Sequence, residues 1–167
     1  MTSIRWSDFN SLTTLDEMVA RVNTSLNNAL LVDTARELAM NVAPARDYWR
    51  QAVGLKNWLE RVFRFVDDPT GKEKLRNPDE MIREYGRLGF ITGDCDEVAI
   101  LGAAMAKAIG LEAVFTIYAF PDPASGVDFY SHVFATVLTP DGRSLSLDVT
   151  KPAGSVPSPT RELTVEV

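Results

Sequence analysis

The sequence predicts a single α+β domain in which helices come first and an antiparallel sheet follows. Three observations support this prediction: helical spacing of apolar residues in the N-terminal third, an apolar run after residue 94, and β-branched and aromatic segments from residue 113 onward. Helices followed by strands are typical of the α+β class. The chain has 167 residues, which is enough for one domain with a buried core.

The N-terminal third is expected to be helical. Thr14 followed by Glu17 has the pattern of a capping box, which predicts that the first helix begins there. A second helical run extends from Leu30 to about Val42, either continuing the first or following it after a kink. Pro44 is compatible with the first turn of a third helix. The apolar stripe of that helix, which indicates core packing, comprises Trp49, Ala52, Leu55, Leu59, Val62 and Phe63.

Two further helices are predicted in the middle of the chain. The Asp-Asp-Pro-Thr-Gly segment at 67–71 is a cluster of helix and strand breakers and predicts a loop. Asn77 and Pro78 then supply a cap and a first helical residue for a short helix through Tyr85, closed by glycines 86 and 89. The run from Cys95 to Ile109 is apolar on all sides in its middle, which predicts a central helix buried on several faces. Gly110 suits its C-terminal end.

The last part of the chain predicts the sheet. Strands are expected from Ala113 to Phe120, from Asp128 to Leu138 and from Ser144 to Val149, and Leu163 to Val167 are candidates for an edge strand. The expected organisation is therefore one domain over 1–167. It has a helical part at 1–62, a core that carries the chemistry at 63–150, and a C-terminal tail at 151–167.

Composition excludes several classes of function. The formal charge is −6 and no cluster of Lys and Arg is present, so no nucleic-acid partner is expected. No signal peptide or membrane-spanning run is visible, and with a lone cysteine we expect a cytoplasmic protein without a membrane partner. One Cys and one His cannot supply the four ligands of a structural zinc site. The acidic pairs at 67–68 and 94–96 lack the spacing of a calcium loop, so we expect no metal and no cofactor.

The candidate site is built around Cys95, the only cysteine. A thiolate is stabilised at a helix N-terminus by unpaired N–H groups and the macrodipole. Asp94 is a candidate cap, and Glu97 completes a capping-box pattern. The carboxylates of Asp94, Asp96 and Glu97 act in the opposite direction, because nearby negative charge disfavours a thiolate. A histidinium partner is therefore required, and His132 is the only histidine.

The turn after the second strand predicts how His132 meets Asp148. The Pro-Asp-Gly sequence at 140–142 suits a three-residue hairpin loop with glycine in the left-handed position. Thr139 would then pair with Arg143, and counting outward sets Phe134 opposite Asp148. His132 lies on the same face, one diagonal step away, at ~7–8 Å between backbones. A two-residue loop would place Asp148 on the opposite face, so the turn chemistry favours a hydrogen bond between His132 and Asp148.

Each of these residues has an ordinary structural interpretation. A lone Cys is usually an inert core thiol, a lone His on a strand is usually structural, and an Asp after a strand is usually a turn former. Together they predict a catalytic triad with Cys95 as nucleophile, His132 as base and Asp148 as the group that orients the imidazole. The Cys95 backbone N–H would serve the oxyanion, with a second donor from a Trp or Asn side chain of the helical third as one possibility.

Three motifs of the chain resemble the transglutaminase-like superfamily, relatives of papain-type cysteine peptidases. They are Gly93-Asp94-Cys95-Asp96-Glu97, His132-Val133-Phe134 and Leu147-Asp148-Val149-Thr150. Val149 replaces the commoner proline of the family and Phe134 the commoner tryptophan. The resemblance covers about Phe65 to Thr150, and the 67–78 region is similar to small bacterial and phage-encoded members, for which a virion location would also be compatible.

The resemblance implies a papain-like, transglutaminase-core fold and thiol acyl chemistry on an amide of a peptide or protein substrate. Cys95, His132 and Asp148 would form the triad, and hydrolysis of the peptidase or amidase type is favoured over acyl transfer to an amine. The alternative is a structural or interaction protein, in a phage setting for example, that retains the fold without turnover. The oligomeric state stays open at this point.

Overall fold

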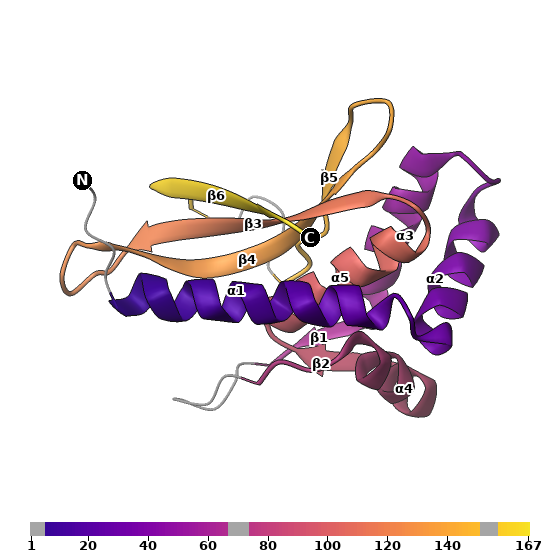
Figure 1. The fold of residues 1–167 in the computed structure, drawn as a ribbon, viewed down its shortest axis with the longest axis horizontal. Coiled ribbons are helices and arrows are strands. Elements are labelled where there is room, and N and C mark those ends of the chain that lie inside the picture. Colours follow the sequence, from indigo (N-terminus) through magenta and orange to yellow (C-terminus); the bar gives the residue numbers. More distant parts are fainter. Residues whose placement is uncertain (1–5, 67–73, 151–156) are drawn as a thin grey trace.

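The computed structural model describes residues 6–66, 74–150 and 157–167, with side chains described from Thr13 onward. The predicted loop at 67–71 lies outside the described residues. Helices and a four-stranded antiparallel sheet form the fold, with the long helix α1 running beside strand β4 and helix α5 packed between the sheet and the other helices (Figure 1). A short two-stranded sheet, β1 and β2, lies below α5 in this view.

The N-terminal third is helical, as predicted, but two helix starts differ from the prediction. Helix α1 spans Trp6–Ser25, so Thr14 lies inside it and the predicted cap there is wrong. Helix α2 spans Ala29–Val42 and is separate from α1, because the Asn28 side chain accepts the backbone N–H groups that open it. Helix α3 spans Tyr48–Val62, and its cap is Asp47, which accepts the N–H of Arg50. Pro44 therefore precedes the helix and is not in its first turn.

Helix α3 buries the stripe that its spacing predicts. Ala52, Leu55, Trp58, Leu59 and Val62 are buried in the core. Trp49 is only half-buried, and the guanidinium of Arg143 lies over its ring, with the Cζ atom 4.4 Å from the ring centroid. The chain then enters strand β1, Phe63–Phe65, which pairs in parallel with strand β2, Ile91–Gly93.

Helix α4, Pro78–Leu88, lies between these two strands in the sequence. It begins at Asn77 as predicted, and the Asn77 N–H donates to Glu80 Oε2 at 3.1 Å. It runs beyond the predicted end at Tyr85 and stops at Gly89, whose φ of 78° is left-handed and suits glycine. Strand β2 then leads through one residue, Asp94, into the central helix.

Helix α5, Cys95–Ala108, is the centre of the core. Every residue from Val98 to Ala106 is buried, as its apolar surface on all sides predicts. Small side chains allow close packing: a Cβ added at Gly102 would lie 3.0 Å from a methyl of Leu147. The helix therefore carries Cys95 on a rigid, deeply buried element.

The main sheet has the strand order β5-β4-β3-β6 and all its pairs are antiparallel. Strand β3 spans Glu112–Pro121, β4 spans Asp128–Leu138 and β6 spans Arg161–Glu166. Strand β6 fills the edge beside β3, close to the position predicted from the sequence. Strand β5, Ser144–Ser146, is shorter than predicted, and Asp148 lies just after it.

Candidate active site

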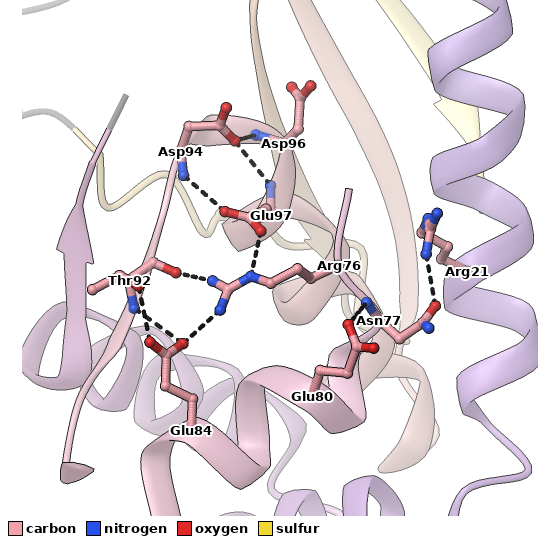
Figure 2. Close-up of polar contacts among 9 residues, drawn as sticks. All are labelled: Arg21, Arg76, Asn77, Glu80, Glu84, Thr92, Asp94, Asp96 and Glu97. Carbon is pink, nitrogen blue, oxygen red and sulfur yellow. Dashed lines mark hydrogen bonds and ion pairs between the residues drawn. The ribbon is translucent and has the colours of Figure 1, made fainter. Parts of the chain in front are cut away.

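Cys95 is the first residue of α5, and its position is fixed by a capping box. Asp94 Oδ1 accepts the backbone N–H groups of Asp96 and Glu97 at 3.1 and 3.4 Å. In return, Glu97 Oε2 accepts the N–H of Asp94 at 3.3 Å (Figure 2). This is the reciprocal arrangement that the sequence predicts. It holds Cys95 at the positive end of the helix macrodipole.

The hairpin between β4 and β5 has the predicted register. The Thr139 N–H donates to the Arg143 carbonyl at 2.9 Å, and Gly142 has a φ of 83° in the left-handed region. Thr136 pairs with Ser146, and the Leu147 N–H donates to the Ala135 carbonyl at 2.8 Å, so the register continues past the end of β5.

This register brings His132 and Asp148 together. Asp148 Oδ2 lies 2.6 Å from His132 Nε2, which is the predicted hydrogen bond. Asp148 Oδ1 accepts the backbone N–H of Thr150 at 3.1 Å and its hydroxyl at 2.8 Å. Burial raises the pKa of the Asp148 carboxyl, but the hydrogen bonds from His132 and Thr150 outweigh burial, so the pKa lies below its usual value.

An ionised Asp148 determines the tautomer of His132. A carboxylate only accepts hydrogen bonds, so Nε2 of the imidazole must carry the proton that it donates. In the neutral ring, Nδ1 is then the unprotonated nitrogen and can accept a proton. His132 itself is buried, with 4% of its surface exposed, which limits the orientations that its ring can adopt.

Cys95 and His132 line the same cavity, which has a volume of about 260 Å³. Its other walls come from β3, β4, the start of α5 and helix α1, which contributes Thr14, Leu15 and Met18. The contribution of α1 was missed at the sequence level. Leu15 could be assigned from its spacing only to a buried face, because periodicity does not show which neighbour a face contacts.

The thiol is in a setting that disfavours its ionised form. Burial raises the pKa of Cys95, and the negative charges of Asp96 and Asp94 raise it further, while the backbone N–H of Val133 opposes this increase. The thiol donates to Asp96 Oδ1, with 3.5 Å between sulfur and oxygen. Among the contacts of the described residues, no hydrogen bond joins Cys95 to His132. The two residues share a cavity, with the thiol turned towards Asp96.

The second oxyanion donor is not found among the described Trp and Asn side chains, because none of them lines this cavity. Trp58 has a buried indole Nε1 without a hydrogen-bond partner, but it packs edge-on against Tyr85 in the core. The Trp6 and Asn10 side chains lie outside the described part of the chain. The cavity walls contain Tyr130 and Ser131 of β4 as polar neighbours of His132.

The described part of the chain also gives information on metal-binding groups of side chains and on membrane-spanning helices. Within residues 6–66, 74–150 and 157–167, no group of three or more His, Cys, Asp or Glu side chains is placed to hold a metal ion. In the same part of the chain, no helix combines the length and apolar character needed to cross a membrane.

Comparison with known proteins identifies the family. No curated protein matches the chain. Among solved structures, calcium-bound LapG from Legionella pneumophila aligns with 81% of this chain and 87% of its own, at 20% sequence identity and a TM-score of 0.41. A family model described as the transglutaminase-like superfamily matches residues 34–149, a span that includes Cys95, His132 and Asp148 but not α1. The predicted family and its mixed helix and sheet fold are thereby confirmed, and the chain belongs to the transglutaminase-like superfamily.

Proposed function

We propose that this protein is a cysteine enzyme that cleaves an amide of a peptide or protein through a thioester on Cys95, as a peptidase or amidase. The observation that carries the proposal is the 2.6 Å hydrogen bond from His132 to Asp148 beside the cavity that His132 shares with Cys95. This arrangement supplies a nucleophile, a base with a free ring nitrogen and a group that orients the base.

In the first half of the reaction, His132 Nδ1 takes the proton of the Cys95 thiol, and the sulfur attacks the carbonyl carbon of the amide. The carbonyl oxygen becomes an oxyanion near the N-terminus of α5, where the Cys95 N–H can donate to it. The C–N bond then breaks, and His132 returns the proton to the leaving amine. The acyl group remains on Cys95 as a thioester.

In the second half, water replaces the amine at His132. Nδ1 takes a proton from the water as its oxygen attacks the thioester, the C–S bond breaks, and the sulfur leaves with the proton to restore the thiol. Asp148 stays ionised throughout and stabilises the imidazolium that forms twice per cycle. An amine in place of water would give a new amide, and the product therefore distinguishes hydrolysis from acyl transfer.

One observation favours the alternative, a structural or interaction protein without turnover. Burial, Asp96 and Asp94 all raise the pKa of Cys95, as expected for a core thiol. Transfer of the proton to His132 overcomes this effect only when the thiolate and the imidazolium form as a pair, because opposite charges in contact stabilise each other.

The test is the pH dependence of Cys95 alkylation. Cys95 is the only cysteine, so iodoacetamide labelling followed by mass spectrometry reports on this one sulfur. The proposal predicts reaction between about pH 5 and 7, well below the usual thiol pKa of ~8.5, and loss of that reaction in His132→Ala. The denatured chain supplies the free-thiol reference. A folded protein that reacts more slowly than this reference at every pH, with or without His132, would support the structural alternative.

A further inference from the structure

Arg76 lies directly behind the turn that carries Cys95. Its guanidinium donates through Nε to Glu97 Oε1 at 2.5 Å, through Nη1 to Glu84 Oε2 at 2.6 Å, and through Nη2 to the Thr92 carbonyl (Figure 2). The side chain is 15% exposed, and its two carboxylate partners, Glu84 and Glu97, are 13% and 4% exposed. It precedes α4 and belongs to neither element that meets at Cys95.

These contacts connect both sides of the cysteine turn. The Thr92 carbonyl belongs to strand β2, which enters the turn, and Glu97 belongs to the first turn of α5, which leaves it. Glu97 in turn accepts the N–H of Asp94 at 3.3 Å. A single planar guanidinium therefore fixes the strand and the helix relative to each other, with Cys95 between the two attachment points.

Gly93 provides independent evidence that the Glu97 carboxylate is held tightly against this turn. A Cβ atom built on Gly93 would lie 2.3 Å from Glu97 Oε2 and 3.1 Å from Glu97 Cβ. Glu97 thus occupies the space that any larger residue at 93 would need. A carboxylate at this depth needs a charged partner, and Arg76 is the partner that the contacts show.

We propose that Arg76 is a positioning residue for Cys95: by joining the Thr92 carbonyl to the Glu97 carboxylate, it fixes the turn that holds the sulfur in the cavity shared with His132. This inference rests on the function proposed above. Arg76 touches neither substrate nor sulfur in this proposal, and acts only through Glu97 and the turn backbone. A displacement of about 1 Å in a reacting group can cost ~100-fold in rate, so loss of this bridge has a measurable consequence.

The test compares five variants of the full chain, His132→Ala among them, by the alkylation rate of Cys95 across pH and by melting temperature. Arg76→Met removes the bridge and is expected to lower the alkylation rate near pH 6 by ~10- to 100-fold. Glu37→Gln removes an exposed carboxylate of α2 that makes none of the bridge contacts, and it is expected to retain the wild-type profile. Met81 is a fully buried side chain of α4, so Met81→Ala leaves a cavity in the core and lowers the melting temperature. It does not alter the bridge and therefore controls for destabilisation alone.

Arg76→Lys serves as the conservative variant and covers the case in which Arg76→Met fails to fold. A lysine keeps the charge beside Glu97 but is a point charge that lacks the planar fork, so an intermediate alkylation rate is expected. The low-pH limb is the Cys95 alkylation that occurs below about pH 7. If His132→Ala abolishes this limb while Arg76→Met or Arg76→Lys leaves it at the wild-type level, the role of Arg76 is overturned and the proposed function is not. A wild-type protein without any low-pH limb would overturn the proposed function and the role of Arg76 with it. An equal loss of rate in Met81→Ala would show that destabilisation accounts for the effect, which also overturns the positioning role.

Discussion

Asp96 is predicted to hold the Cys95 thiol in its neutral form, and Asp96→Asn should make the thiol more reactive. The Asp96 oxygen lies 3.5 Å from the sulfur. Two like charges at about 4 Å repel by ~1 kcal/mol in water and ~4 kcal/mol at the effective dielectric constant of a protein surface. Because Asp96 is only half-buried, the lower part of this range applies. About 1.4 kcal/mol, or one pKa unit, is expected.

The assay is the alkylation rate of Cys95 over a pH series. One unit of pKa corresponds to a rate increase of roughly tenfold at any pH below the thiol pKa. The matched control is Glu37→Gln, which removes the same charge from an exposed position on α2 and should leave the rate unchanged. An Asp96→Asn rate equal to that of Glu37→Gln would refute the reasoning, since the carboxylate nearest the sulfur would then have no electrostatic effect on it. High salt should not reproduce the change, because a contact at this distance is screened weakly.

Three further predictions follow from the contacts of the site. Asp148→Asn should lower the His132-dependent alkylation rate by roughly 100-fold or more while Cys95 stays in place, because the amide no longer fixes the imidazole tautomer; an unchanged rate would show that Asp148 does not orient the ring. In acid unfolding, the stability from ionised Asp148 is complete above its ordinary pKa of ~3.9 and declines as the pH falls through its lower folded-state pKa; the wild-type protein should therefore lose more stability in this window than Asp148→Asn does. Gly93→Ala should destabilise the fold by ~1–3 kcal/mol, because the new methyl overlaps the Glu97 carboxylate; a denaturation midpoint equal to that of Gly86→Ala, where the added methyl meets open space, would contradict this.

The parts of the site that follow local rules could be predicted from the sequence. Asp94 and Glu97 flank the helix start with the residue types of a capping box, and the contacts have that pattern. The turn at 140–142 has one favoured loop length, which is sufficient to set the pairing of β4 with β5 and the meeting of His132 with Asp148. Both inferences need only near neighbours in sequence, for which spacing and turn chemistry are strong guides.

The parts that depend on tertiary packing could not be predicted in this way. The pattern at Thr14 has the residue types of a cap, but α1 continues through it, because a capping pattern does not prevent preceding residues from forming helix. Strands β1 and β2 have three residues each, too short for an alternating pattern to be visible. Arg76 lies 16 positions from Thr92 and 21 positions from Glu97 in the sequence. No local pattern therefore indicates the bridge between them. The contribution of α1 to the cavity wall could not be predicted for the same reason.

The setting of the thiol is the feature on which the function depends most. The sequence already predicts that Asp94 and Asp96 disfavour a thiolate, and the structure adds burial to the same side. Against these effects stand the N–H of Val133, the N-terminus of α5 and the imidazole of His132, which lines the same cavity. Cys95 can be catalytic only if the effects that stabilise the thiolate outweigh the effects that raise the pKa of the thiol.

The most direct test is therefore the alkylation rate of Cys95 against pH in the wild-type protein and in His132→Ala. The account predicts a reactive limb below about pH 7 in the wild-type protein that disappears in the variant, leaving a thiol that reacts more slowly than a free thiol. Identical profiles for the two proteins, both slower than the denatured chain, would contradict the account and assign Cys95 to the core.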